Sequence, residues 1–345
     1  VKKNIRTLSL DELKSVYAEW GEKPFRAQQT WDWLWKKGAR SFDEMSNLAA
    51  ALRDKLKESF DFPSLAVDTQ QVSSDGTVKV RFKTFDNFFV EGVLIPAPEI
   101  DRVTVCVSSQ VGCSLTCAFC ATGKMKRERN LSFDEIFDQV TVVNKICMER
   151  HGRPLTNIVF MGMGEPLLNY SDVNRAIARI TAEDSLNMSP RRITVSTAGI
   201  AKMIRKLGDD QVKYRLAISL HAPTDMKRSK IMPINEQNNL QVLIEAMEYY
   251  YGKTKNRISF EYILFDGFND SIDDAKQLLK IARRIPSKIN IIEYNPVEGT
   301  GFTKANEQKL NAFIQYLSDN NVTVTVRRSK GKDIDAACGQ LANKG

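Results

Sequence analysis

Short apolar, β-branched runs alternate with amphipathic segments over most of the chain, and this alternation restricts the possible folds more than any other feature. Strands that alternate with helices form parallel sheets, because each helix carries the chain back to the start of the next strand. About 230 residues with six or more such units suit a complete or partial parallel βα barrel. The strand-like runs cover residues 103–108, 156–161, 192–196, 214–220, 257–264, 289–294 and 322–326.

Different patterns precede these repeats. Up to about residue 70 the apolar residues recur at helical spacing, and Ser9 followed by Asp11 and Glu12 is typical of a helix N-cap with an acidic first turn. Residues 78–82 and 88–95 predict a β-hairpin. We therefore expect an α/β fold, with a partial (β/α)6 barrel between a small helical domain and a C-terminal extension. The expected segments are a helical accessory domain (1–75), a hairpin linker that carries Glu91 (76–98), the barrel (99–300) and a final helix, strand and loop that carries Cys338 (301–345).

Composition and charge narrow the class of protein. The 345 residues are 42% hydrophobic and 27% charged, which is typical of folded globular chains and not of disordered or coiled-coil ones. A net charge of +8 favours an anionic partner such as a nucleic acid. The sequence has no run of about 18 apolar residues and no secretory leader, so it predicts no membrane span. Few cysteines for this length favour a reducing cytoplasm over a secreted disulfide scaffold.

Three closely spaced thiols are the strongest chemical motif. Cys113, Cys117 and Cys120 can surround one metal centre. Tetrahedral zinc normally needs four protein ligands, and no second Cys or His pair exists because His151 and His221 stand alone. Three cysteines leave one iron of a 4Fe-4S cluster open to substrate or cofactor. The spacing therefore favours a cluster over zinc or a group of structural thiols.

Tryptophans and basic residues gather in the N-terminal region. Such a mixture can stack on RNA and grip its phosphates. Large aromatic side chains more often fill a small core, and the basic residues would then lie on a solvated face. The packing interpretation is the favoured one. The residues are Trp20, Trp31, Trp33 and Trp35, with Arg26, Lys36, Lys37 and Arg40.

The three-cysteine loop, with Phe119 before its last cysteine, resembles the signature of radical S-adenosylmethionine (SAM) enzymes, whose core is a partial barrel. Longer motifs in the same order closely resemble the RlmN/Cfr group of RNA methyltransferases, and they span nearly the whole chain. These motifs lie at residues 161–169, 189–199, 219–222, 228–235, 295–296 and 333–341.

The resemblance implies methylation at C2 of an adenosine, A2503 of 23S rRNA and, in many members, A37 of tRNA. C2 is an electron-poor carbon without a lone pair, so it cannot attack the SAM methyl group directly, and a radical route is needed. The implied requirements are one 4Fe-4S cluster, two SAM molecules per turnover and an external electron donor such as a reductase or flavodoxin-like protein. The group also implies a monomer.

By the same resemblance, Cys338 is methylated and its methylene radical joins C2, Glu91 removes the C2 proton, and Cys106 attacks the Cys338 sulfur to leave a transient Cys106–Cys338 disulfide. Taken without the resemblance, both cysteines suit ordinary packing. Glu91 is the only ionisable residue between Phe88 and Ile95, and a buried unpaired carboxylate is costly, which gives it a functional hint of its own. Cys147 matches none of the functional positions of the group, so we expect it to be a packing residue.

Residues at the ends of several predicted strands match SAM contacts of the group. Glycine allows close backbone approach, and a carboxylate pairs with the SAM ammonium. The alternative for these residues is loop capping at strand ends. The matching positions are Gly164, Glu165, Ser196, Ser219, Leu220, His221 and Asn295.

Two basic groups flank the chemistry and are candidates for holding RNA phosphates, although a basic run is often only a solvated surface. The basic candidates are Lys124, Lys126, Arg127 and Arg129 after the cysteine loop, and Arg327, Arg328, Lys330 and Lys332 before Cys338.

Two alternatives to a C2 methyltransferase stay open: a Cfr-type enzyme that methylates C8, and a non-catalytic RNA-binding module with a structural metal.

Overall fold

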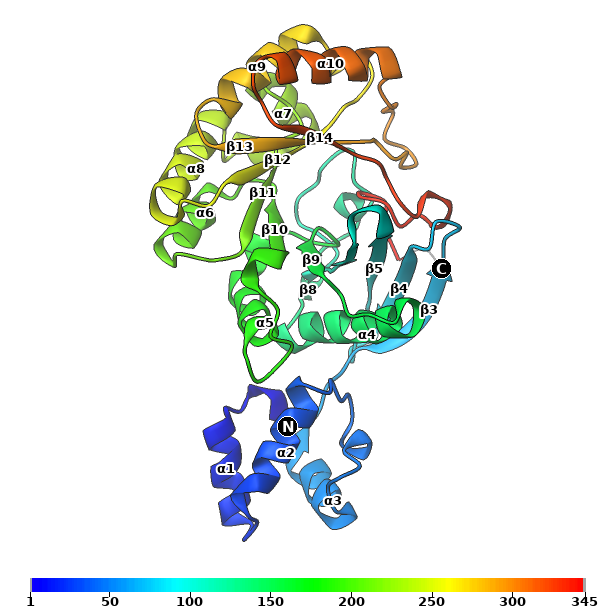
Figure 1. Cartoon of the computed structure of the whole chain (residues 1–345), viewed down its shortest axis with the longest axis vertical. Coiled ribbons are helices and arrows are strands. Elements are labelled where there is room, and N and C mark those ends of the chain that lie inside the picture. The colour runs from blue at the N-terminus through cyan, green and yellow to red at the C-terminus, as the bar shows by residue number, and fades with distance from the viewer. Residues whose placement is uncertain (1, 344–345) are drawn as a thin grey trace.

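A curved ten-stranded sheet organises the chain, and the computed structural model describes residues 2–343 (Figure 1). The strand order is β14-β13-β12-β11-β10-β9-β6-β5-β4-β3, and every pairing from β6 to β14 is parallel. All seven strand-like runs of the sequence form these strands, which confirms the partial barrel. Their bounds are β6 (Arg102–Cys106), β9 (Asn157–Phe160), β10 (Ile193–Thr197), β11 (Arg215–Ser219), β12 (Ile258–Ile263), β13 (Ser287–Ile292) and β14 (Val324–Arg327).

Three antiparallel strands extend the sheet beyond β6. The predicted hairpin is confirmed as β4 (Val78–Lys83) and β5 (Phe89–Ala97). The helical prediction was wrong for residues 66–72, which form β3 (Ala66–Val72) at the edge of the sheet. Most of β3 is exposed, so no apolar alternation marked it, and its pairing with β4 stabilises it as a strand.

Helices cover the convex face of the sheet, and the cysteine loop and C-terminal segment lie on the concave side (Figure 1). The first of these helices, which begins at Phe133, has a capping box at its N-terminus, in which Ser132 and Glu135 satisfy free amides of the first turn. Apolar side chains between helices and sheet form the core. The outer helices are α4 (Phe133–His151), α5 (Tyr170–Thr181), α6 (Ala201–Asp209), α7 (Asp225–Ile231), α8 (Leu240–Thr254), α9 (Ile272–Ala282) and α10 (Glu307–Asp319).

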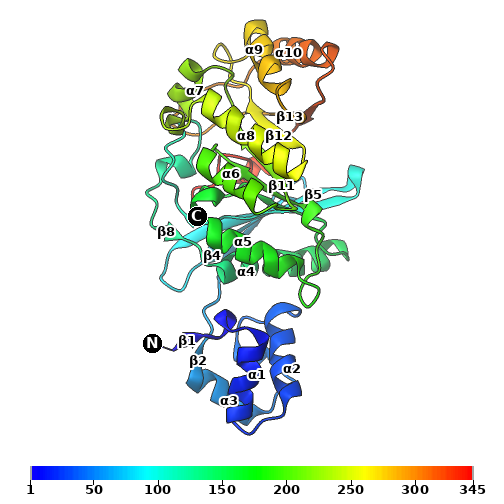
Figure 2. The same ribbon diagram turned by 90° about the vertical axis from the view of Figure 1, so that its left-hand side faces the viewer.

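The N-terminal helices form a lobe next to α4 (Figure 2). They are α1 (Leu10–Glu19), capped by Ser9 as predicted, α2 (Pro24–Trp35) and α3 (Ala50–Ser59), with two short strands, β1 (Lys3–Asn4) and β2 (Phe60–Asp61). Trp31 and Trp35 are buried, and the Trp35 ring lies 5.2 Å from that of Phe137 in α4. The packing interpretation is therefore confirmed for these two tryptophans.

The chain after β14 crosses the open side of the sheet to the antiparallel strands (Figure 1). Asp75 accepts a hydrogen bond from the Gly331 amide at 2.9 Å, and Asp333 accepts one from the Ser74 amide at 3.1 Å. The Arg81 guanidinium reaches the carbonyl of Asn343 at 3.2 Å. These contacts fix the segment that carries Cys338. No helix among residues 2–343 is long and apolar enough to cross a membrane.

Candidate active site

A cavity of about 150 Å³ opens at the C-terminal ends of the parallel strands. Most of the residues predicted to bind the cluster and SAM line it, although they come from segments far apart in the chain. They are Cys113, Cys117 and Cys120 of the loop after β6, Gly164 and Glu165 after β9, Ser196 of β10, Ser219 and His221 at the end of β11, and Cys338.

The cysteine loop is fixed by tight backbone contacts. It follows β7 (Gln110–Val111), which pairs with β8 (Arg129–Asn130). Gly112 has φ +73°, and a side chain there would lie 2.0 Å from the Lys126 carbonyl oxygen, so only glycine fits. Burial raises the pKa of the Cys113 thiol to about 11 and that of Cys117 further. Bound iron lowers a thiol pKa, so these thiols suit metal ligation better than free ionisation.

The thiols fit a cluster better than a single ion. Among residues 2–343, no three Cys, His, Asp or Glu side chains are placed to hold one metal ion. In a 4Fe-4S cluster each cysteine binds a different iron, so its thiols surround a larger body. Cys113, Cys117 and Cys120 all line the one cavity, so the loop brings all three residues to the space that a cluster would occupy.

Glu165 is a buried carboxylate at the end of β9. Its oxygens accept hydrogen bonds from the amides of Ala198, at 2.8 Å, and Leu167, at 3.0 Å. Burial raises its pKa, and none of the described basic side chains forms an ion pair with it. The preceding Gly164 has φ +94° and packs against Gln110 where a side chain would clash. The site therefore fits a small cationic group such as the SAM ammonium.

His221 is buried at the opposite wall, with the Phe119 ring edge-on at 4.9 Å. Its Nδ1 accepts a hydrogen bond from the Ile263 amide at 3.1 Å. Burial, with a smaller effect of Arg228, lowers the pKa of His221 to about 3. The imidazole is therefore neutral and carries its proton on Nε2.

Two predicted SAM contacts do not line this cavity. The Leu220 side chain is buried in the core. The Asn295 amide donates a hydrogen bond to Ser329 Oγ at 2.8 Å, so it joins the end of β13 to the segment after β14. Contacts of these two residues with SAM stay predictions.

A second cavity, of about 80 Å³, adjoins the first. Cys106, at the end of β6, lines it together with Arg327, and Cys338 lines both cavities. Burial raises the pKa of Cys106 to about 12. Both thiols are free here, as are the other four, so the disulfide of Cys106 with Cys338 is absent from this state and stays a prediction. Cys147 is buried in α4, as expected for packing.

Glu91 lies in β5 and contacts the C-terminal segment instead of either cavity wall. Its Oε2 accepts hydrogen bonds from the amides of Ala342, at 2.9 Å, and Asn343, at 3.0 Å. Lys79 Nζ lies 3.4 Å from Oε1, and both side chains are buried. Oε1 accepts no hydrogen bond within the described part of the chain.

The basic candidates differ in how free they are. Five of them are exposed and Lys330 is half-buried; the exposed ones are Lys124, Lys126, Arg127, Arg328 and Lys332. Most of the exposed ones also have polar partners: Lys124 bonds the Glu298 carbonyl, Lys126 lies 3.5 Å from Glu128, Arg127 donates to Asn130 at 2.9 Å, and Lys332 pairs with Glu293 at 2.7 Å. Arg327 pairs with buried Glu261 at 3.2 Å.

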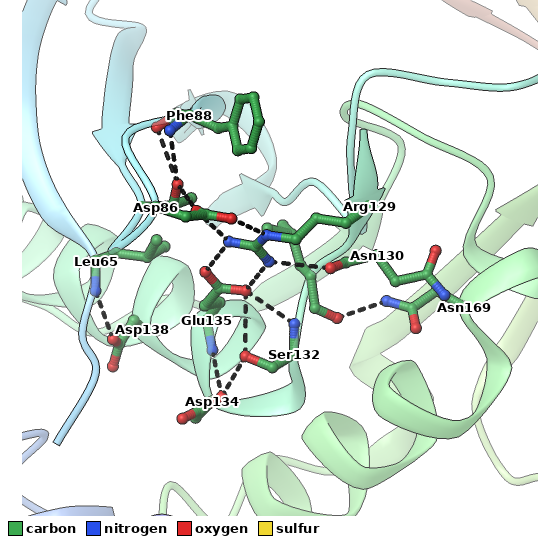
Figure 3. Close-up of polar contacts among 12 residues, drawn as sticks. Leu65, Asp86, Phe88, Arg129, Asn130, Ser132, Asp134, Glu135, Asp138 and Asn169 are labelled. Atoms are coloured by element: carbon green, nitrogen blue, oxygen red, sulfur yellow. Dashed lines mark hydrogen bonds and ion pairs between the residues drawn. The ribbon is translucent and has the colours of Figure 1, made fainter. Parts of the chain in front are cut away.

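Arg129 was predicted to hold phosphate, but its guanidinium is enclosed by Asp86 at 2.6 Å and Glu135 at 2.7 Å (Figure 3). These hydrogen bonds and charges raise its pKa against the opposing effect of burial. Because two carboxylates already neutralise it, the structure makes it a poor phosphate ligand.

The sequence reasoning missed Glu261, which is buried in β12 and lines the first cavity. Asn290 donates to its Oε1 at 2.7 Å, and Arg327 pairs with its Oε2. A carboxylate inside the apolar run of 257–264 was the available signal, as it was for Glu91.

Comparison with known proteins finds relatives that match nearly the whole chain. Residues 3–61 match the family model "Ribosomal RNA large subunit methyltransferase N-terminal domain", and residues 107–279 match "Radical SAM superfamily". Relatives named "Probable dual-specificity RNA methyltransferase RlmN" include one from Cytophaga hutchinsonii (54% identical, 99% of this chain, 93% of the relative) and one from Flavobacterium johnsoniae (51%, 99% and 98%).

A solved structure agrees with these matches. A radical SAM methyltransferase from Sphaerobacter thermophilus superimposes with a TM-score of 0.93 at 39% identity, over 99% of this chain and 100% of the other. The expected family is thereby confirmed, and with it the 4Fe-4S cluster and SAM that the family implies. The chain belongs to the RlmN family of radical SAM RNA methyltransferases.

Proposed function

We propose that the protein forms 2-methyladenosine at A2503 of 23S rRNA and at A37 of tRNA. The position of Cys338 carries the proposal. Its side chain lines both cavities, so it connects the wall that holds the three clustered cysteines with the wall that holds Cys106. A sulfur in that place suits the transfer of carbon from a cofactor to a nucleotide base.

Cys113, Cys117 and Cys120 would hold one cluster, and Glu165 with its neighbours in the cavity would hold SAM. When bound, these groups supply a methyl group and a 5′-deoxyadenosyl radical, at the expense of two SAM molecules and an electron from a reductase or flavodoxin-like donor. The buried, uncompensated charge of Glu165 orients the SAM ammonium.

The remaining roles belong to three side chains. Cys338 Sγ exchanges its proton for a methyl group and, after loss of one hydrogen atom, bonds C2 of adenine through that carbon. After one electron has passed from the adduct back to the redox system that supplied it, the cluster and its donor, Glu91 would accept the C2 proton. The Cys106 thiolate then attacks the Cys338 sulfur, and the electron pair of the broken sulfur–carbon bond passes to the base, which takes up a proton. An external reductant reduces the resulting disulfide.

The test is mass spectrometry of unmodified 23S rRNA and tRNA transcripts after incubation with reconstituted protein, reductant and methyl-labelled SAM. Wild type should yield labelled 2-methyladenosine in both RNAs. Cys106→Ala should accumulate a covalent protein–RNA adduct, because the sulfur–carbon bond cannot be resolved. Cys147→Ala is the matched control and should behave as wild type.

Label at C8 would replace the C2 assignment with Cfr-type chemistry. Cleavage of SAM without label in either RNA would overturn the substrate assignment. Absence of SAM cleavage by protein of verified iron content would favour a non-catalytic binding module.

A further inference from the structure

The turn between β4 and β5 exposes two aromatic rings at the active-site end of the sheet. Phe85 is 67% exposed and Phe88 36%. Val93 of β5 pairs antiparallel with Cys106, the last residue of β6, so residues before Val93 extend past the C-terminal end of that strand. The turn therefore lies on the side of the molecule where the cavities open.

The turn is held rigidly. Thr84 Oγ1 bonds Asp86 at 2.6 Å and accepts from the Phe88 amide at 3.0 Å. Arg129 donates to both oxygens of Asp86 and to both oxygens of Glu135, at distances of 2.6–2.8 Å (Figure 3). Since Glu135 is buried at the start of α4, this clamp fixes the turn to the barrel.

The clamp also holds the ring of Phe85 in place. The Arg129 guanidinium carbon lies 5.0 Å from the centroid of the Phe85 ring, so the cation supports the ring. An apolar ring that is exposed and immobilised has lost side-chain entropy without gaining burial, which is unfavourable unless a partner covers it.

Charge around the turn identifies the kind of partner. Lys83 in β4 and Lys126 and Arg127 just before β8 are exposed. An aromatic ring beside unburied cations suits RNA, because bases stack on rings while phosphates meet the cations. A purely apolar protein surface would leave these cations desolvated without partners.

We propose that Phe85, positioned by the Arg129–Asp86–Glu135 clamp, stacks on an unpaired base of the substrate RNA near the target adenosine. This inference rests on the proposed function. It assigns to Arg129 the role of holding the stacking platform, in place of direct phosphate contact.

Fluorescence polarisation tests it with an unmodified 23S rRNA transcript over a series of salt concentrations. Phe85→Ala should weaken binding about 5- to 150-fold, the range for loss of one base–aromatic stack. Phe85→Trp should retain wild-type affinity. Ile100→Ala is the matched control, because Ile100 is 57% exposed at the opposite end of β5, and it should bind as wild type does.

Salt dependence separates stacking from charge. Phe85→Ala should leave the slope of log affinity against log salt unchanged, whereas Lys126→Gln with Arg127→Gln should reduce it by about 1–2. Wild-type affinity in Phe85→Ala, with the Gln variants weakened, would overturn the stacking proposal alone. Failure of the wild type itself to bind the transcript would overturn the proposed function.

Discussion

Glu165 illustrates at the scale of one residue how this cavity would suit a cationic ligand. The carboxylate is buried and receives two backbone hydrogen bonds, yet no described basic side chain compensates its charge. Such a group is costly to the folded protein and gains most when a ligand supplies the missing cation.

Glu165→Gln should therefore weaken SAM binding at least about 10-fold, because a charge-assisted hydrogen bond is lost. Wild-type affinity should also fall as the pH is lowered, because protonation of a carboxyl with a raised pKa competes with the ammonium. Isothermal titration calorimetry of the reconstituted protein measures both effects. Glu128→Gln, at an exposed residue that lines neither cavity, is the control, and equal SAM affinity in both variants would contradict the assignment.

His221 should stay neutral far below the usual titration range. Its pKa is depressed from 6.5 to about 3, so the unfolded chain binds a proton that the folded one does not, and this residue's contribution to stability falls as pH drops from 6.5 towards 3. The chain has only two histidines, and His151 is exposed. Nitrogen-15 NMR of histidine-labelled protein should show the Nε2–H form of His221 at pH 5, and an imidazolium signal from it would refute this.

Among the structural elements, the segment after β14 is held by several polar contacts, and one of them involves a proposed site residue. Glu91 accepts hydrogen bonds from the amides of Ala342 and Asn343, so the carboxylate proposed to accept the C2 proton also anchors the segment after β14, which carries Cys338. Transfer of the C2 proton to Glu91 would weaken these hydrogen bonds and loosen that segment.

Glu91→Gln should consequently increase amide hydrogen exchange within residues 331–343, by about 10-fold, since two charge-assisted hydrogen bonds become neutral or are lost. Asp273→Asn, which removes an exposed ion pair with Lys276 within α9, is the control. Mass-spectrometric exchange compares the three proteins. Unchanged protection of this segment in Glu91→Gln would show that other contacts hold it.

Sequence patterns predicted the buried elements correctly, but they failed where contacts between distant parts of the chain determine the local structure. The parallel strands were predictable because their apolar runs are buried on both faces. Exposed β3 left no such pattern. The thiols and Glu165 were found by their motifs, whereas the role of Arg129 depends on Asp86, 43 residues earlier in the chain, which local charge counting does not reveal.

At the scale of the whole molecule, the N-terminal lobe and the barrel both contribute side chains to one hydrophobic core. Trp31 Nε1 donates to Asp184, 153 residues away, at 2.6 Å, and buried Arg6 pairs with Asp138 of α4 at 2.8 Å. These contacts couple the lobe to the barrel.

We expect a single cooperative unfolding transition for both parts. Trp35→Ala should lower the free energy of unfolding by about 3–5 kcal/mol, the usual cost of emptying a large core position, and should shift the transition as a whole. Urea unfolding followed by circular dichroism and by tryptophan fluorescence measures this. Trp33→Ala, at a half-buried site, should cost less. Two separate transitions in the wild type would show that the lobe folds independently.

The strand order ends at β14 on one side and β3 on the other, with no pairing between them among the described residues. The segment after β14 spans this gap, because Gly331 bonds Asp75 and Asp333 bonds Ser74, so a loop and not a ladder of strands closes this side of the site. A segment held by a few polar contacts opens at a smaller cost in free energy than paired strands do. The chain around Cys338 would therefore move without any change in the sheet that carries the other site residues.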